Sequence, residues 1–175
     1  FTYTGEESSS IVLIAGGVGV TPMMSVLRYL TDRAWPGAIY LVYSCRTSND
    51  LIFREEIEYR RKRYPNLHVT LALSREENPK GIAIKGRITG ELLTGQVPDL
   101  KSRRVHICGP QVMMDAVKET LFGLGLSKDQ VKTEAFGPAK GTGKPTGIAD
   151  KTAPPAAQNT ARSLATVSFA RSGKS

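Results

Sequence analysis

The chain has 175 residues, 40% of them hydrophobic and only 7% aromatic, and 24 Lys and Arg against 16 Asp and Glu give a net charge of +8. This composition supports one core of roughly 100–150 residues and excludes wholesale disorder. No apolar run reaches the ~20 residues of a membrane helix, and the first residues lack the features of a signal peptide. Two cysteines form neither a disulfide framework nor a four-thiolate metal site, so we expect no metal and a cytoplasmic location.

The excess positive charge is concentrated near the carboxyl end. Residues 137–175 hold six Lys or Arg and one Asp, with no aromatic residue between Phe136 and Phe169. A nucleic-acid-binding domain needs a basic face on its folded part, usually with interleaved aromatic side chains. The charge distribution therefore argues against a nucleic-acid partner and is typical of a solvated linker.

A change of composition near residue 137 divides the chain. Residues 138–163 are mostly Gly, Pro, Ala, Thr and Lys, which predicts a flexible linker. The GTGK sequence at 141–144 fails as a phosphate loop, because Pro145 stands where Ser or Thr is required. Residues 164–175 regain a strand-like alternation. Since a single strand cannot form a domain, we expect them to be the first strand of a truncated module.

Strands and helices alternate through residues 11–136. Buried strands are predicted at 11–16, 38–44, 67–74, 104–109 and 131–136, and helices at 50–64 and 111–125. Another helix is predicted to open with Thr21 as N-cap and Pro22 in first position, and Asp50 leads the 50–64 helix. The stretch 75–103 is irregular, with a short helix at 90–93. This order predicts an α/β fold, a Rossmann-like three-layer sandwich with a five-stranded parallel sheet in order 3-2-1-4-5.

Two turns rich in Gly and Pro follow the central strands of this predicted sheet, AGGVGVTP at 15–22 and Cys108-Gly109-Pro110. Ligands of such sheets bind outside the carboxyl ends of the strands, where glycine lets a phosphate approach the backbone and a helix N-terminus offers free N–H groups. The first turn departs from the dinucleotide fingerprint, because Pro22 occupies the third glycine position. No acidic residue follows the second strand either, where Ser44-Cys45-Arg46 stands instead, so a classical dehydrogenase is disfavoured.

The motifs resemble the pyridine-nucleotide domain of the ferredoxin–NADP reductase superfamily. The matching pieces cover most of residues 11–137: AGGVGVTPMMSVL (15–27), LVYSCRTSNDLIFREEIE (41–58), LALSRE (71–76), KGRI (85–88), HICGPQVMMDAV (106–117) and TEAFG (133–137). The resemblance implies an NAD(P)-binding domain at 11–137, with residues 1–10 ending a flavin-binding domain that precedes it. Residues 164–175 are similar to the first strand of a plant-type [2Fe–2S] ferredoxin module, whose four cysteines this chain lacks.

The same resemblance implies hydride transfer from NADPH or NADH to FAD or FMN, followed by one-electron transfer to a [2Fe–2S] centre. Glycines and the following helix start hold the pyrophosphate and ribose, and the CGP turn lies at the nicotinamide, with Cys108 against the hydride-donating carbon. Met113 is a further candidate contact, although core packing is favoured for it. The end of the fifth strand shields the flavin, through Glu134 and Phe136, with sheet-edge packing as the alternative for Phe136. The contact residues are Gly16, Gly17, Gly19, Thr21, Pro22, Cys108, Gly109 and Pro110.

The choice of nucleotide depends on residues after the third strand. Relatives that use NADP place a Ser-Arg pair on the 2′-phosphate, and Ser74-Arg75 matches that position, with Arg46 near the end of the neighbouring strand. A guanidinium and a hydroxyl suit a phosphate. Such relatives usually continue with Lys-x-Tyr, whereas Lys80-Gly81-Ile82 lacks the tyrosine. The pattern favours NADPH slightly over NADH.

Two interpretations from other classes remain open. A metal- or thiol-based enzyme would need ligand spacing, but His68 and His106 lie inside apolar runs and have no such spacing to Cys45 and Cys108. A non-catalytic domain that senses nucleotide is the other alternative. The expected partners of this chain are the nucleotide, the flavin domain and the ferredoxin-like module, with no membrane segment in the chain itself.

Overall fold

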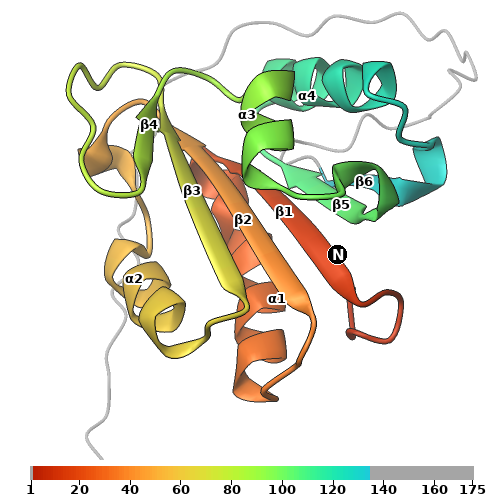
Figure 1. Ribbon diagram of the computed structural model, residues 1–175. Helices are drawn as coiled ribbons and strands as arrows, with labels where there is room; N and C mark the ends of the chain where they lie inside the picture. Colours follow the sequence, from red (N-terminus) through yellow and green to blue (C-terminus); the bar gives the residue numbers. More distant parts are fainter. Residues whose placement is uncertain (1, 135–175) are drawn as a thin grey trace, which may run out of the picture. The chain divides into compact units, whose positions relative to one another are not determined.

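Six parallel strands form one sheet in the computed structural model, which describes residues 2–134. The predicted order of five strands is confirmed, and a three-residue strand extends the sheet at one edge (Figure 1). Two of the three residues of that strand are exposed and it has no apolar run, so the sequence pattern does not predict it. In sheet order the strands are β4 (Ala83–Lys85), β3 (Leu67–Leu73), β2 (Ala38–Cys45), β1 (Ser10–Gly16), β5 (Arg104–Cys108) and β6 (Val131–Glu134).

Helices cover both faces of the sheet and complete the predicted three layers (Figure 1). One face carries α1 (Val20–Asp32) and α2 (Arg54–Arg63), and the other carries α3 (Gly90–Gln96) and α4 (Gln111–Gly123). Short 3-10 turns precede several elements: η1 (Gly17–Gly19), η2 (Ser48–Asp50), η3 (Leu100–Ser102) and η4 (Lys128–Gln130). In this part of the chain no helix is long and apolar enough to cross a membrane.

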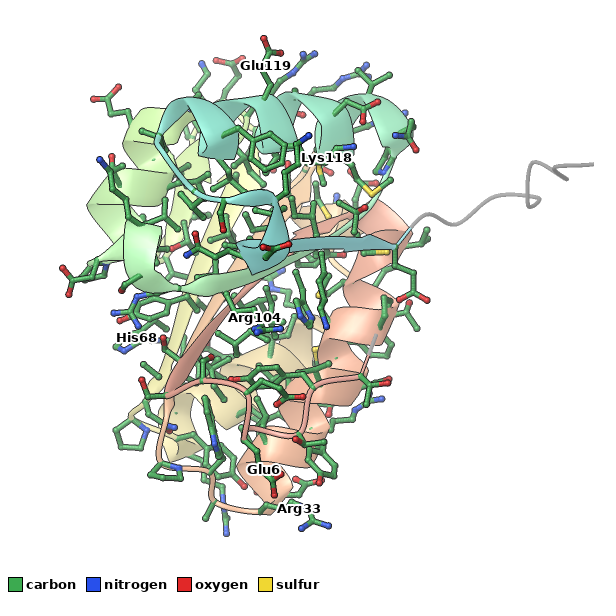
Figure 2. All side chains as sticks on the ribbon, turned by 90° about the vertical axis from the view of Figure 1, so that its right-hand side faces the viewer. Glu6, Arg33, His68, Arg104, Lys118 and Glu119 are labelled. Carbon is green, nitrogen blue, oxygen red and sulfur yellow. The ribbon has the colours of Figure 1, made fainter. Side chains whose placement is uncertain are left out.

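Side chains of the central strand β1 point alternately into two apolar cores, one on each face of the sheet. In β1, Ile11 and Leu13 point into the layer of α1 and α2, whereas Val12 and Ile14 point into the layer of α3 and α4. All four side chains are fully buried. This explains why β1 reads as a continuous apolar run in the sequence, since neither face of the strand meets solvent. Seen from the side, Glu119 projects from α4 away from the sheet (Figure 2).

Two segments differ from the sequence prediction. The predicted 50–64 helix begins only at Arg54, because Asp50 belongs to η2, where its carboxylate accepts hydrogen bonds from the backbone and hydroxyl of Thr47, and Phe53 takes a left-handed φ of 57°. The stretch 75–103 is more ordered than expected, since it contains β4, a two-turn α3 and η3. The predicted linker at 138–163, the 164–175 segment and Phe136 lie outside the described residues.

The segment before β1 packs on the same domain. Tyr3 is almost fully buried and forms edge-on ring contacts with Trp35 and His106, with ring centroids 5.9 and 5.8 Å apart. The indole N–H of Trp35 donates to the carbonyl of Gly5 over 3.1 Å. Residues 2–9, which the sequence assigns to the end of another domain, therefore also stabilise this one.

A charged cluster joins the two helices of one face. Arg28 of α1 donates two hydrogen bonds, 2.8 and 2.5 Å long, to the carboxylate of Glu56 in α2. Arg60 donates to the same carboxylate over 3.0 Å and to Asp32 over 2.8 Å, and it also bonds the hydroxyl of Thr31. These hydrogen bonds, led by those from Arg28, lower the pKa of Glu56 from 4.5 to about 2.

Replacing Glu56 with glutamine should therefore destabilise the domain by about 1 to 2 kcal/mol at pH 7, a value reduced by partial solvent exposure of the pair. Because folding lowers this pKa, the stabilisation is present above pH 4.5 and is lost as pH falls towards 2. Urea unfolding at pH 7 and pH 2.5 measures this difference. Glu58→Gln, which breaks only the local pairs to Arg61 and Lys62, is the control and should show a much smaller change.

A buried histidine should make the stability of the domain depend on pH in a second, higher pH range. His106 of β5 is fully buried, and its pKa falls from 6.5 to about 4, first through loss of solvation and then through the charges of Lys132 and Arg104, the latter labelled in Figure 2. The unfolded chain takes up this proton first on acidification, so stability should fall between pH 6.5 and 4 by on the order of 2 kcal/mol. In His106→Gln this slope should disappear from urea unfolding. In His68→Gln, which changes an exposed side chain, the slope should persist.

Candidate functional site

The turn after β1 runs without a break into α1. Its short helix η1 joins α1 directly, and α1 begins at Val20 with Gly19 as its N-cap. The predicted N-cap at Thr21 is therefore wrong: the helical backbone starts earlier, and the Thr21 hydroxyl donates to the carbonyl of Val18 over 2.9 Å. Pro22 lies in the first helical turn, where a residue without an N–H group costs no hydrogen bond.

The turns after β1 and β5 pack against each other through glycines. A Cβ atom on Gly19 would overlap the carbonyl of Cys108 and lie 2.6 Å from the nitrogen of Gly109. A Cβ on Gly109 would lie 3.1 Å from the Cα of Gly16. Because backbone meets backbone here, only glycine fits, and the two predicted turns form one continuous edge.

One side of this edge is open. A Cβ on Gly17 would meet no atom within 4 Å, and this residue has a φ of +52°. Val18, the next residue, is 62% exposed, and Val112, in the first turn of α4, is 82% exposed. Thr21 and Pro110 are exposed as well. The sequence places both valines in or next to the glycine turns but does not indicate that they are exposed, because their apolar side chains would be expected in the core.

Two methionines of α4 have different surroundings. Met114 is buried in the core between α4 and the sheet, as predicted. Met113 is half-buried and lies under the glycine turns, since its Cε would be 3.0 Å from a Cβ on Gly16 and 2.8 Å from one on Gly109. Met113 therefore supports the edge from below, and a direct contact with nucleotide stays a prediction.

A buried thiol ties the glycine turn to the loop after β2. Cys45 accepts a hydrogen bond from the backbone N–H of Gly17 and donates one to the carbonyl of Asp50 over 3.5 Å. Its sulfur also bonds the hydroxyl of Tyr43, which in turn accepts from the N–H of Ile52 over 3.2 Å. Burial raises the pKa of Cys45, so the thiol stays protonated. The sequence shows this cysteine after a strand but not its three partners.

The three polar residues predicted for the 2′-phosphate lie together. The N–H of Arg75 donates to the carbonyl of Arg46 over 2.8 Å, and that of Ser74 donates to the carbonyl of Cys45 over 3.0 Å. These bonds continue the β2–β3 pairing beyond both strands. All three side chains are exposed at the carboxyl edge of the sheet, which is where the sequence places them.

Two carboxylates lie close to these arginines. Hydrogen bonds from Thr47 lower the pKa of Asp50, and the charges of Arg46 and Arg75 lower it further. Glu76 accepts hydrogen bonds from the N–H and hydroxyl of Ser48, 3.0 and 3.2 Å long. Asp50 thus offsets part of the positive charge that a 2′-phosphate would meet.

Cys108, predicted at the nicotinamide, is fully buried at the end of β5. Its neighbour across the sheet is Glu134, and burial first, then the charge of Glu134, raises the pKa of the thiol. The side chain is thus a neutral group packed beneath the edge. The roles of Cys108 and Glu134 stay predictions, and Phe136 lies outside the described residues.

The structure bears on the metal alternative only for residues 2–134. No cluster of three or more His, Cys, Asp or Glu side chains that could hold a metal ion occurs there. His68 stacks on Tyr40 with ring centroids 4.7 Å apart, whereas His106 lies in the opposite core layer beside Tyr3.

Comparison with known proteins identifies the domain. Residues 13–119 match the family model of the oxidoreductase NAD-binding domain. NADH oxidoreductase HCR of Escherichia coli is 38% identical over 128 residues, which are 73% of this chain and 37% of that protein. The reductase subunit of glycine betaine monooxygenase from Chromohalobacter salexigens is 32% identical over 139 residues, 78% of this chain and 38% of that protein.

Comparison with solved structures supports the same assignment. The CS-b5R domains of human Ncb5or, in their NAD+ form, are 28% identical with a TM-score of 0.65, covering 74% of this chain and 38% of that one. The flavohem-like FAD/NAD-binding domain of nitric oxide dioxygenase from Vibrio cholerae is 25% identical with a TM-score of 0.65, covering 73% and 51%. The chain spans a little over a third of the curated relatives' length. It belongs to the oxidoreductase NAD-binding domain family and has the fold of ferredoxin–NADP reductase-like proteins.

Proposed function

We propose that this domain binds NADPH or NADH across the carboxyl edge of its sheet and positions the nicotinamide for hydride transfer to a flavin. The observation that carries the proposal is the pair of glycine turns, which are packed against each other while Gly17 leaves open space on the outer side. Open backbone at a helix start suits a pyrophosphate, because the N–H groups and the helix dipole both favour negative charge.

Different residues along this edge bind different parts of the nucleotide. The turn at Gly17–Gly19 and the start of α1 hold the pyrophosphate, and Ser74 and Arg75 hold the adenosine end. The turn at Cys108–Pro110 orients the nicotinamide, with the neutral thiol beneath it. The nucleotide supplies the hydride chemistry when bound, and the protein supplies orientation and exclusion of water.

The partners follow from the same proposal. A domain that binds FAD or FMN precedes residue 11, and residues 164–175 open a [2Fe–2S] module after a linker at 138–163. Relatives named as a reductase subunit and as an FAD/NAD-binding domain support the flavin part of this arrangement. Cys45 and Cys108 are both free thiols, which fits the reducing cytoplasm.

Nucleotide titration of the purified chain tests the proposal. NADH and NADPH should shift the backbone amide signals of residues 16–21 and of Cys108, Gly109 and Gln111 in NMR spectra, with weak affinity. The chain alone should reduce no dye acceptor, because the flavin that accepts the hydride is bound elsewhere. A chain that leaves those amide signals unchanged at millimolar nucleotide would contradict the proposal.

Replacing Arg75 with alanine should remove a preference for NADPH. An exposed arginine beside Asp50 is expected to favour the 2′-phosphate by about three- to tenfold, less than a fully desolvated pair would. The variant should bind both nucleotides with the affinity that the parent chain has for NADH. Isothermal titration of both nucleotides measures this, with exposed Arg87→Ala as the control. Unchanged NADPH affinity in Arg75→Ala would remove the basis for the preference.

A further inference from the structure

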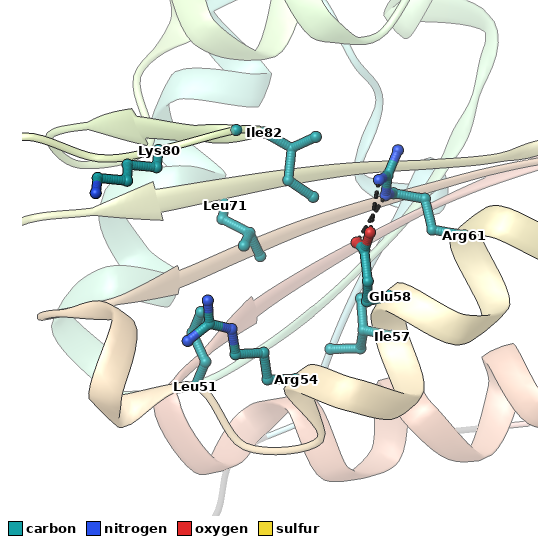
Figure 3. A pocket seen from close by; sticks show the side chains of 9 residues that line it. Leu51, Arg54, Ile57, Glu58, Arg61, Leu71, Lys80 and Ile82 are labelled. Atoms are coloured by element: carbon teal, nitrogen blue, oxygen red, sulfur yellow. Dashed lines mark hydrogen bonds and ion pairs between the residues drawn. The ribbon is translucent and has the colours of Figure 1, made fainter.

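A groove lies between α2 and the loop that precedes β4 (Figure 3). Its main hollow has a volume of about 320 Å³, and a second hollow of about 280 Å³ shares Leu51, Arg54, Leu71 and Lys80 with it. The two hollows therefore adjoin. None of the residues that line the groove belongs to the glycine turns or is Arg46, Ser74 or Arg75, although Leu73 and Glu76 of the second hollow flank the adenosine end of the proposed nucleotide site.

The groove interrupts an otherwise closed layer. Along the α2 side of β3, Leu67, Val69 and Leu73 are buried, with exposed fractions of 3%, 9% and 1%. Leu71, in the middle of the same row, is only half-buried and forms the floor of the groove. Protein interiors are close-packed, so a gap in one row of a packed layer leaves apolar surface that a ligand can cover.

Positive charge lies at one end of this floor. At the other end, Arg61 and Glu58 form an ion pair, in which Arg61 donates two hydrogen bonds to the carboxylate over 2.9 and 3.0 Å, so their charges offset each other. Arg54 and Lys80 line both hollows, and among the described residues neither makes an ion pair. Figure 3 shows these two cations at the end opposite the Glu58–Arg61 pair.

The carboxylate of Glu76 also lines the second hollow and offsets part of this charge. It accepts hydrogen bonds from the backbone N–H and hydroxyl of Ser48 and makes no ion pair with Arg54 or Lys80, so two cations face one carboxylate. Two unpaired cations above an apolar floor attract an anion that carries an apolar body. The groove is large enough for a small organic molecule, since its volume lies at the lower end of known ligand pockets.

We propose that this groove binds a small amphiphilic organic anion, with its apolar body on Leu51, Leu71 and Ile82 and its acidic group between Arg54 and Lys80. A medium-chain carboxylate has this chemistry. The site goes beyond the nucleotide site, and its test does not depend on nucleotide binding.

Titration of the purified chain with octanoate, followed by methyl NMR signals, tests the site. Octanoate should shift the methyl signals of Leu71 and Ile82, and neutral 1-octanol should bind at least about tenfold more weakly because it lacks the charge. Arg54→Gln and Lys80→Gln should each weaken octanoate binding about three- to tenfold. Arg87→Gln, an exposed arginine outside the groove, should leave the affinity unchanged.

A second variant and a second probe separate the alternatives. Leu71→Phe, which fills the floor, should block octanoate while leaving NADH titration of the glycine turns unchanged. Adenosine 2′-phosphate is the other anion to test: if it shifts the same methyl signals and octanoate does not, the groove is part of the nucleotide site and the proposal is overturned. Octanoate shifts that persist in the Arg54→Gln, Lys80→Gln double variant would overturn it as well.

Discussion

Replacing Gly19 with alanine is expected to be the most disruptive single methyl addition in the glycine turns. The added Cβ would overlap the backbone carbonyl of Cys108 and crowd the nitrogen of Gly109, and neither can move without displacing β5 or α4. We expect a loss of about 3 kcal/mol in the free energy of unfolding, together with loss of nucleotide binding. Urea unfolding and nucleotide titration of the same sample measure both effects.

Gly17→Ala is the matched control, because it adds the same methyl group two residues earlier in the same turn. There the Cβ meets nothing, and the only cost is the φ of +52°, about 1 kcal/mol. The variant should stay folded, yet the methyl group would occupy the space assigned to the nucleotide and weaken its binding at least about tenfold. If Gly17→Ala bound nucleotide like the parent chain, the pyrophosphate could not lie over this turn. If Gly19→Ala were as stable as the parent, the close packing of the two turns would be wrong.

The main strands of the fold are readable from the sequence because they are buried on both faces. Residues 11–16 and 38–44 contain almost no polar side chains, so their pattern cannot be confused with that of an exposed segment. β4 has no such signature: Ile84 and Lys85 are exposed, and three residues give no period to detect. Helix starts are also hard to place, as α1 shows, because the 3-10 turn before it is a property of backbone geometry rather than of a capping side chain.

In the candidate site, too, some features can be predicted from the sequence and others cannot. Glycine turns at 16–19 and 108–110 are visible in the sequence because only glycine permits such close backbone approach. The network around Cys45 is not visible, since its partners come from three segments that only the folded sheet brings together. Partial neutralisation of Arg75 by Asp50 is likewise hidden, because Asp50 lies in η2 and Arg75 follows β3, and only the fold brings the two segments together.

The second large effect is expected at Cys108 and needs a reductase in which this domain is joined to its flavin domain. Cys108 sits at the end of β5 with its backbone against Gly19, so its side chain supports the point where the nicotinamide is proposed to lie. Removing the sulfur in Cys108→Ala should let the ring shift, and a displacement of about 1 Å reduces a hydride-transfer rate on the order of 100-fold. The affinity for the adenosine end should stay unchanged. Stopped-flow measurement of flavin reduction over a range of nucleotide concentrations separates the rate from the dissociation constant.

Two further variants distinguish positioning from a general loss of packing. Cys108→Ser keeps the size of the side chain and should recover a large part of the reduction rate, whereas a cavity effect would appear as lower thermal stability in Cys108→Ala without a change of rate. Arg75→Ala should show the reverse pattern: the dissociation constant for NADPH should rise, while the limiting rate of flavin reduction stays unchanged. Since Cys108 and Arg75 lie at the ends of different strands, their effects on the transition-state free energy should add in the double variant. A wild-type reduction rate in Cys108→Ala would place the nicotinamide away from the end of β5.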